Sequence, residues 1–428
     1  MKSLTLNPIH RMQGEVTLPG SKSLSNRALL LAALSTGNTQ LINLLRSDDT
    51  ERMISALKLL GVGIQLSDDW LHCEVTGQEG LFHVQDKLAF NLGNAGTAIR
   101  PLAAVLSLVP GEFLIDGDEY MRERPIGNLT DALSQMGAEI SFGRKPGYPP
   151  FTLKGGQIAG GPVELSGEIS SQFLTALLMA LPLASQNSVI QITGDQVSKP
   201  YLDITLGMLK TFGVSATNRN YKSYDIPGGQ QYLSPGDYLI EGDASSASYF
   251  YAAGALGNGP VRVHGLGLDS VQGDYQFLDT IEAMGARVTR EKTWTEVSGG
   301  DLHGIDVDLN HIPDAAMTVA AMALFAKGRT VIRNVYNWRV KETDRMHAMS
   351  EGLTRLGATV ETTPDTIIID PPETISPAEI DTYGDHRIAM CFSLAALGEA
   401  PVTILDPDCT KKTFPDYFDV FRSLATYT

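Results

Sequence analysis

One pattern recurs six times along the sequence and limits what the chain can fold into. It is a turn of glycine, hydroxyl or acidic residues followed by a long run rich in alanine and leucine. The copies read LPGSKSLSNRALLLAAL from Leu18, LGNAGTAIRPLAAVL from Leu92, LSGEISSQFLTALLMAL from Leu165, IEGDASSASYFYAAGAL from Ile240, LNHIPDAAMTVAAMAL from Leu309 and TYGDHRIAMCFSLAAL from Thr382. Their closing leucines lie about 70 to 75 residues apart, and one sixth of the 428 residues is about 71. We therefore expect six similar units to fill the chain.

A second marker has the same period. Amphipathic stretches end in an apolar–glycine–apolar triplet, centred on Gly61, Gly137, Gly213, Gly285 and Gly357. Glycine adopts the left-handed conformation that closes a helix, so these positions predict helix ends. Short β-branched runs at 189–192 and 366–369 predict strands between the helices. Each unit should therefore contain strands and two helices, one of them apolar nearly all round.

The apolar helices determine the expected architecture. A helix without a polar face must be buried on every side. The simplest arrangement is an α/β protein of two similar domains, each with three units and with the Ala/Leu-rich helices at its centre. The alternative is a set of unrelated core helices in an ordinary α/β protein, but two independent markers would then share a period by chance.

Composition excludes some classes of partner. With 33 Lys and Arg against 49 Asp and Glu the net charge is −16, which disfavours nucleic acid and anionic membrane surfaces. The three cysteines are scattered, which predicts neither disulfides nor zinc. No apolar run reaches the roughly 18 residues of a membrane span. We expect a soluble, cytoplasmic protein that binds neither nucleic acid nor membrane.

The polar turn of each copy precedes the N-terminus of an apolar helix, where free N–H groups and the helix dipole favour anions. The turns at 21–23, 96–97 and 170–172 offer hydroxyls, an amide, a lysine and a glycine that allows close approach. Taken singly, each Ser or Thr could simply be a helix cap. Several copies together with Lys22 favour an anion site. A P-loop does not fit, because Gly14 is one residue out of register with Gly20 for G-x-x-x-x-G-K-[ST].

Basic residues elsewhere support an anionic ligand. Arg122 and Arg124 lie in one short loop, and arginine suits two-pronged recognition of carboxylate or phosphate. Asn337, Lys341 and Arg345 are spaced i, i+4, i+8. If this segment is helical, one face carries two like charges that an anion between them would explain. The alternative is an exposed face neutralised by nearby acids.

Three acid–base candidates lie in the second half of the chain. Glu342 lies beside these cations and could transfer a proton. Asp314 heads an apolar helix, where a carboxylate could instead be only a cap. His386 follows Asp385 and precedes Arg387, which favours an oriented histidine over a metal ligand because no third ligand follows at a useful spacing. We expect no bound metal.

These motifs resemble the enolpyruvyl transferase family, and within it the members that act on shikimate 3-phosphate. The likeness spans the whole chain, and its most specific segments are LPGSKSLSNRALLLAAL, LGNAGTAIRPLAA, RERPIG, SSQFLTALLMA, SKPYLDITL, EGDASSASYF, HIPDAAMT, NWRVKETDR, GDHRIAM and TKKTFPDYF. It implies two domains, residues 21–240 and residues 1–20 with 241–428. Each would hold three βαβαββ repeats around buried parallel helices, an inside-out α/β barrel, with the active site in the cleft between them.

The resemblance also implies a reaction without a cofactor. Phosphoenolpyruvate would pass its enolpyruvyl group to the 5-hydroxyl of shikimate 3-phosphate through a tetrahedral intermediate, releasing phosphate, in the shikimate pathway of aromatic amino-acid biosynthesis. The residues implied for shikimate 3-phosphate are Lys22, Ser23, Arg27, Ser170, Ser171, Gln172, Ser198, Tyr201, Asp314, Asn337 and Lys341. Those implied for phosphoenolpyruvate are Lys22, Gly96, Arg124, Gln172, Arg345, Arg387 and Lys412.

Four residues have implied catalytic roles. Asp314 would take the hydroxyl proton, Glu342 would protonate the methylene carbon, and Lys22 and His386 would stabilise charge on the leaving phosphate. Because these ligands come from both domains, we expect domain closure around the substrates. The net charge would then hide a local basic site within an acidic exterior.

Two rival functions remain. The sibling enzyme that uses UDP-N-acetylglucosamine usually has a reactive cysteine near the position of Arg122, and this chain has none there. A non-catalytic repeat scaffold would have no reason to keep Asp314 and Glu342 among basic residues. The resemblance further implies a monomer that glyphosate inhibits in competition with phosphoenolpyruvate.

Overall fold

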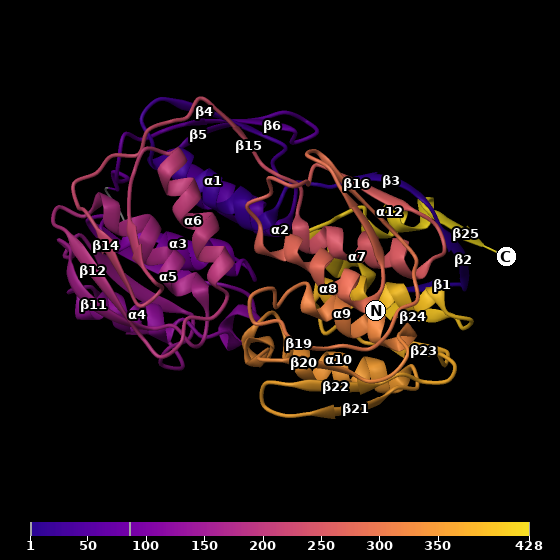
Figure 1. Ribbon diagram of the computed structural model, residues 1–428. Helices are drawn as coiled ribbons and strands as arrows, with labels where there is room; N and C mark the ends of the chain where they lie inside the picture. Colours follow the sequence, from indigo (N-terminus) through magenta and orange to yellow (C-terminus); the bar gives the residue numbers. More distant parts are fainter. Residues whose placement is uncertain (1, 85–86, 428) are drawn as a thin grey trace. The chain divides into compact units, whose positions relative to one another are not determined.

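The computed structural model describes residues 2–84 and 87–427. The chain forms two compact units, one from Gly20 to Ile240 and the other from the residues up to Pro19 together with Glu241 onward. We call them the N-terminal unit and the C-terminal unit. Both combine mixed β-sheets with helices, so the α/β class predicted from the repeat is confirmed (Figure 1).

The sheets of the N-terminal unit follow one plan, in which a parallel strand pair continues into two antiparallel strands. The strand orders are β15-β4-β6-β5, β7-β8-β10-β9 and β11-β12-β14-β13. In the third sheet, for example, Gly161 to Ser166 pair in parallel with Ser188 to Thr193. The strands are β4 Asn38–Ile42, β5 Gly63–Leu66, β6 His72–Thr76, β7 Leu88–Asn91, β8 Gly111–Asp116, β9 Glu139–Phe142, β10 Phe151–Gly155, β11 Gly161–Ser166, β12 Ser188–Thr193, β13 Thr217–Arg219, β14 Ser223–Ile226 and β15 Asp237–Leu239.

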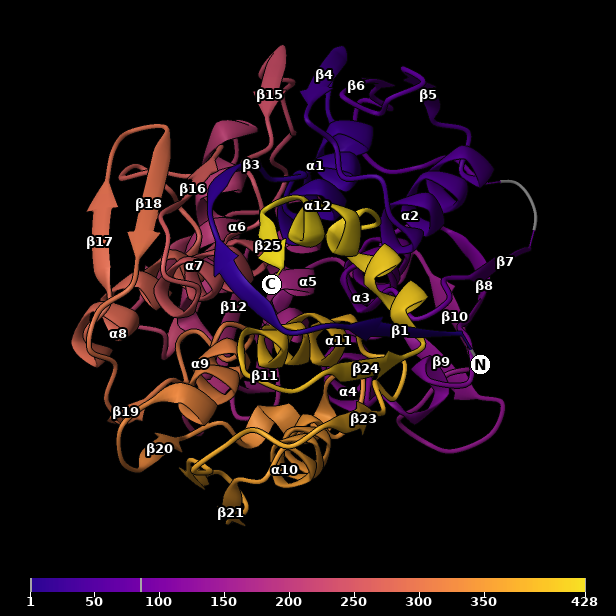
Figure 2. The same ribbon diagram turned by 90° about the vertical axis from the view of Figure 1, so that its right-hand side faces the viewer.

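The C-terminal unit uses the same plan twice and then departs from it. Its regular sheets have the orders β17-β18-β16-β3 and β19-β20-β22-β21, and Figure 2 shows β17 and β18 side by side. In the third sheet, β23 and β24 are parallel but the N-terminal strand β1 completes the sheet, while β2 pairs with β25. The strands are β1 Ser3–Leu6, β2 Ile9–Met12, β3 Gly14–Thr17, β16 Val261–His264, β17 Arg287–Arg290, β18 Trp294–Ser298, β19 Asp306–Asp308, β20 Thr330–Arg333, β21 Thr359–Thr362, β22 Ile367–Asp370, β23 Ala378–Ile380, β24 Val402–Leu405 and β25 Ala425–Tyr427.

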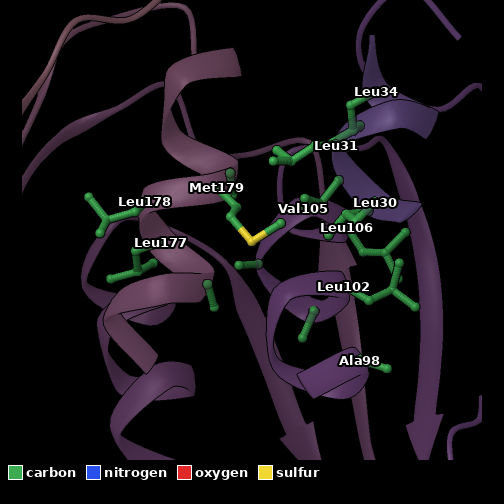
Figure 3. Close-up of a cluster of buried hydrophobic side chains, with 14 of the residues drawn as sticks. Leu30, Leu31, Leu34, Ala98, Leu102, Val105, Leu106, Leu177, Leu178 and Met179 are labelled. Atoms are coloured by element: carbon green, nitrogen blue, oxygen red, sulfur yellow. The ribbon is translucent and has the colours of Figure 1, made fainter. Parts of the chain in front are cut away.

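All six Ala/Leu-rich segments form helices that are buried on nearly every side, as their lack of a polar face predicts. In the first of them, 12 of 13 residues are buried. These helices are α1 Lys22–Leu34, α3 Gly96–Leu106, α5 Ser171–Ala180, α7 Ala244–Leu256, α9 Ala316–Met322 and α11 His386–Ser393. Figure 3 shows side chains of α1, α3 and α5 gathered in one core, with Met179 pointing toward Val105.

The other helices alternate with the buried ones along the chain. They are α2 Asp48–Leu59, α4 Gly127–Gln135, α6 Lys199–Thr211, α8 Phe277–Met284, α10 Arg345–Arg355 and α12 Tyr417–Ser423. Short 3₁₀ turns are η1 Met121–Glu123, η2 Leu181–Leu183, η3 Gly273–Gln276, η4 Ala323–Phe325, η5 Tyr336–Val340, η6 Leu394–Leu397 and η7 Pro407–Lys412. None of the described helices combines the length and apolar character needed to cross a bilayer.

The glycine marker correctly predicted helix ends. All five marker glycines have positive φ, between 81° for Gly213 and 112° for Gly285. They follow α2, α4, α6, α8 and α10, where the left-handed conformation lets the backbone close the last turn.

The predicted helical face with Asn337, Lys341 and Arg345 is wrong. Asn337 belongs to η5, Lys341 leaves helical geometry with ψ −146°, and α10 begins at Arg345. The cause is Asp344, whose side chain accepts from the backbone N–H of His347 and caps a new helix. The i, i+4, i+8 spacing therefore does not place these side chains on one helix face.

Side-chain hydrogen bonds join successive repeats near the N-terminal ends of the buried helices, each from the fifth residue of one helix to the second or third residue of the next. Asn26 donates to Thr97, 71 residues away, and Arg100 donates to Gln172, 72 residues away. In the C-terminal unit, Ser248 bonds Thr318 across 70 residues. The N-terminal ends of α1, α3 and α5 therefore lie together, as those of α7 and α9 do.

Candidate active site

The predicted site residues fall into two sets. The N-terminal unit contains Lys22, Ser23, Arg27, Gly96, Arg124, Ser170, Ser171, Gln172, Ser198 and Tyr201. The C-terminal unit contains Asp314, Asn337, Lys341, Glu342, Arg345, His386, Arg387 and Lys412.

Three predicted residues begin buried helices of the N-terminal unit. Lys22 is the first residue of α1, Gly96 of α3 and Ser171 of α5. The first turn of a helix has N–H groups without intrahelical partners and the positive end of the dipole. Because these helix ends lie together, the N-terminal unit has a place suited to an anion.

Two cations on α1 are buried and differ in their partners. Nζ of Lys22 lies 3.7 Å from a carboxylate oxygen of Asp49. Arg27 donates to the hydroxyl of Thr205 at 3.1 Å and to the carbonyl of Ser23 at 2.8 Å, so neutral groups hold it. Burial lowers the pKa of Arg27 to about 10, which leaves the guanidinium charged at neutral pH.

Gly96 lies between two arginines. A β-carbon added there would come within 2.7 Å of Nη2 of Arg124 and closer still to Nη1 of Arg100. Arg124 donates to the backbone oxygen of Asn94 at 3.0 Å and to its side-chain oxygen at 2.7 Å. Arg100 donates to Gln172, a residue predicted to bind substrate, and this bond connects Gln172 to α3.

The remaining polar residues of this unit surround α5 and α6. Ser170 caps α5 by accepting from the N–H of Gln172 at 3.2 Å. Ser198 precedes α6 with φ 53°, a left-handed conformation that is uncommon for residues other than glycine. Tyr201 lies in the first turn of α6, close enough to Arg27 to raise the pKa of that guanidinium against the effect of burial.

In the C-terminal unit, Asp314 lies among three cations. Its Oδ1 is 2.8 Å from Nη1 of Arg345 and 3.4 Å from Nζ of Lys341. Its Oδ2 is 3.1 Å from Nη2 of Arg387. Burial alone would raise the pKa of Asp314, but these cations outweigh it and hold the pKa well below its ordinary value. The carboxylate is therefore ionised.

Arg345 connects the predicted proton carriers. Besides Asp314, it donates from Nη2 to Glu342 at 2.7 Å and from Nε to Asp385 at 2.7 Å. Burial would lower its pKa, but Asp385, Glu342 and Asp314 together raise it above its ordinary range. A single guanidinium thus contacts both residues implied to move protons.

Three predicted residues lie beside this group. Nδ1 of His386 is 3.4 Å from Oδ1 of Asp385, and both side chains are fully buried. Asn337 is buried within η5. Lys412 is buried at the end of η7, which packs against α11.

Three residues in these groups were not predicted, namely Asp49, Asn94 and Arg100, and each contacts a predicted residue. Asp385 was expected only to orient His386, and its bond to Arg345 was not predicted. Arg100 and Gln172 lie near the starts of buried helices in successive repeats, so the repeat could have predicted that these two segments lie close together. Asp49 and Asp385 place carboxylates beside Lys22 and Arg345, so the predicted basic site is less basic than a count of its cations implies.

Comparisons with known proteins agree over the full chain. The family model described as EPSP synthase (3-phosphoshikimate 1-carboxyvinyltransferase) matches residues 6–421. Proteins named 3-phosphoshikimate 1-carboxyvinyltransferase from Citrobacter koseri and Klebsiella pneumoniae are 57% and 58% identical over 426 residues, covering 100% of each chain.

A solved EPSP synthase from Acinetobacter baumannii matches with TM-score 0.83 and 26% identity, covering 99% of this chain and 98% of that one. The enolpyruvyl transferase NikO from Streptomyces tendae, at 16% identity, has a similar fold with TM-score 0.77, over 99% of this chain and 97% of its own. The chain belongs to the EPSP synthase family.

Proposed function

We propose that this enzyme transfers the enolpyruvyl group of phosphoenolpyruvate to the 5-hydroxyl of shikimate 3-phosphate and releases phosphate. The observation that carries the proposal is the buried group around Asp314, in which an ionised carboxylate and Glu342 share a guanidinium. The two groups that such a reaction needs for proton transfer are thus held together among cations suited to anionic substrates.

We assign the polar residues of the N-terminal unit mainly to shikimate 3-phosphate. Lys22, the α5 helix end and Arg27 would bind its phosphate and hydroxyl groups, with Asn337 and Lys341 contributing from the C-terminal unit. Phosphoenolpyruvate would be held by Lys22, Gly96, Arg124, Gln172, Arg345, Arg387 and Lys412. Support comes from the buried state of most of these cations, since a desolvated cation attracts an anion more strongly than an exposed one.

The proton transfers follow from the charges around Asp314. Without substrate, Arg345, Lys341 and Arg387 make this carboxylate a weak base. Substrate anions would compete for the same cations, and the pKa of Asp314 would rise. Asp314 would then accept the hydroxyl proton, while Glu342 delivers a proton to the methylene carbon and makes C2 electrophilic. In the second step the tetrahedral intermediate eliminates phosphate, with Lys22 and His386 stabilising its charge.

We also propose that both units contribute to one substrate site and that each unit is an inside-out barrel of three βαβαββ repeats. By the assignments above, neither unit alone contains all the residues that would bind the two substrates. Substrates should therefore bring the two sets together and exclude water. Small-angle scattering with both ligands should give a smaller radius of gyration than without them, and an unchanged radius would contradict closure.

Phosphate release with each acceptor tests the reaction. Phosphoenolpyruvate with shikimate 3-phosphate should release phosphate, and phosphoenolpyruvate with UDP-N-acetylglucosamine should not. Turnover only with the sugar nucleotide would show the wrong acceptor, and release with neither acceptor would refute the enzyme assignment. Competitive inhibition by glyphosate, a monomeric state and a cytoplasmic location stay predictions from the sequence.

A further inference from the structure

Tyr249 is a buried residue of α7 that contacts Arg387, one of the residues proposed to bind phosphoenolpyruvate. Its hydroxyl accepts a hydrogen bond from Nη1 of Arg387 at 3.2 Å. The other terminal nitrogen of Arg387, Nη2, lies 3.1 Å from Asp314. A neutral hydroxyl and a carboxylate therefore hold the two ends of one guanidinium.

The ring of Tyr249 is fixed by neighbouring side chains. It packs edge-on against Tyr417, with ring centroids 5.8 Å apart and an interplanar angle of 81°. The Tyr417 hydroxyl bonds the hydroxyl of Ser393 at 2.8 Å and donates to the carbonyl of Met390 at 3.3 Å. Both partners belong to α11, the helix that carries Arg387. The Tyr249 ring is thus held beside α11 by ring packing, which does not need the Tyr417 hydroxyl.

The phenol differs from a carboxylate in how it holds an arginine. Burial holds the pKa of Tyr249 well above its ordinary value, so the hydroxyl is neutral. A neutral acceptor orients the guanidinium and leaves its charge available to an anion. Arg345 is the contrasting case, because Asp314, Glu342 and Asp385 all contact it and balance its charge.

We propose that Tyr249 is a positioning residue that directs Arg387 toward phosphoenolpyruvate. This role rests on the proposed function, in which Arg387 binds that substrate. When the substrate competes with Asp314 for Nη2, the hydroxyl at Nη1 keeps the guanidinium in place. Without the hydroxyl, Arg387 would have to be ordered when phosphoenolpyruvate binds, and the entropy cost would weaken that binding. Binding of shikimate 3-phosphate would be little affected.

The test variant is Tyr249→Phe, which removes the hydroxyl and keeps the ring. Hydrogen bonds to charged groups typically change affinity by about tenfold or more. We expect KM for phosphoenolpyruvate to rise about tenfold, with KM for shikimate 3-phosphate within about twofold of the original protein. The matched control is Tyr417→Phe, which removes a buried hydroxyl from the same aromatic cluster without touching Arg387. It should lower the melting temperature but leave both KM values unchanged.

Three results would overturn the proposal. The first is an unchanged KM for phosphoenolpyruvate in folded Tyr249→Phe, and the second is an equal rise in Tyr417→Phe. The third is unfolding of Tyr249→Phe while Tyr417→Phe stays folded, which would assign the hydroxyl to stability. In an Arg387→Lys background, Tyr249→Phe should add less than about twofold, and a full tenfold addition would contradict coupling through Arg387.

Calorimetric binding of phosphoenolpyruvate in the presence of shikimate 3-phosphate, with Glu342→Gln added to both proteins to prevent turnover, separates this role from the reaction. If the reaction is wrong, the original protein fails to release phosphate. If only the role of Tyr249 is wrong, the original protein and Tyr249→Phe bind phosphoenolpyruvate equally well. If both proposals hold, the original protein turns over and the variant binds about tenfold more weakly.

Discussion

Asp385 accepts hydrogen bonds from Nε of Arg345 at 2.7 Å and from Nη2 of the same residue at 3.3 Å. Both side chains are almost completely buried, at 0% and 1% exposure. A buried charge without its partner costs several kcal/mol, so this pair should matter to folding as well as to the arrangement of the site.

Asp385→Asn should lower the free energy of unfolding by about 3 to 5 kcal/mol, because it leaves a buried guanidinium with less compensating charge. Urea unfolding followed by circular dichroism measures this difference. The control is Asp370→Asn, which breaks a surface pair with Arg329 at 2.7 Å and should cost less than about 1 kcal/mol. Equal losses in the two variants would contradict the importance of burial.

Replacement of the proposed proton carriers should slow turnover strongly. Glu342→Gln and Asp314→Asn each keep the shape of the side chain but remove its acid–base function. We expect kcat to fall at least about 100-fold in each, as for other positioned acids and bases. Glu351→Gln provides a control on α10, because Glu351 pairs with Arg355 at the surface. Near-normal kcat in either site variant would remove that residue from the proposed chemistry.

The repeat explains why so much of the fold could be predicted. Helix ends at Gly61 and Gly285 depend on local backbone preference, and buried helices depend on the absence of a polar face, so both are readable from short segments. The error at 337–345 had a local cause as well, since the cap at Asp344 competed with the helical spacing. The sequence did contain a signal for this cap, since the acidic residue Asp344 lies just before the helix.

The site was less readable because its charge pairs join distant segments. Asp385 and Arg345 are 40 residues apart, and no local pattern connects them. Tyr249 reaches Arg387 across 138 residues from a helix that looks like any other core helix. By contrast, Asn26 and Thr97 both lie near the starts of buried helices in successive repeats. A repeat therefore predicts which helix ends lie close together but not the acids that balance the cations.

Gly96→Ala should weaken binding of phosphoenolpyruvate and of inhibitors longer than it. The added methyl group would come within 2.7 Å of Nη2 of Arg124, so at least one guanidinium must shift. We expect KM for phosphoenolpyruvate to rise severalfold and the inhibition constant of glyphosate to rise more. Inhibition kinetics measure both constants. Gly207→Ala, on α6 with open space at the added carbon, is the control and should change neither. Unchanged glyphosate inhibition in Gly96→Ala would contradict the location of this pocket.

A salt-bridged acid stabilises a folded protein more as pH rises. Asp274 should do the opposite and stabilise this protein less as pH rises. Burial and the negative charge of Asp314 raise its pKa from 3.8 to about 6, although Ser245 donates a hydrogen bond to it. The folded state therefore holds this proton where the unfolded chain has lost it, and the contribution of Asp274 to stability falls as pH rises from about 4 to 6.

Asp274→Asn removes that fall, which is on the order of 3 kcal/mol. Urea unfolding at pH 4 and pH 7 should show the variant gaining stability relative to the original protein as pH rises. Ser245→Ala should extend the fall to higher pH, because the hydrogen bond it removes lowers the pKa of Asp274. Parallel pH curves for Asp274→Asn and the original protein would show that Asp274 has the same pKa in the folded and unfolded states.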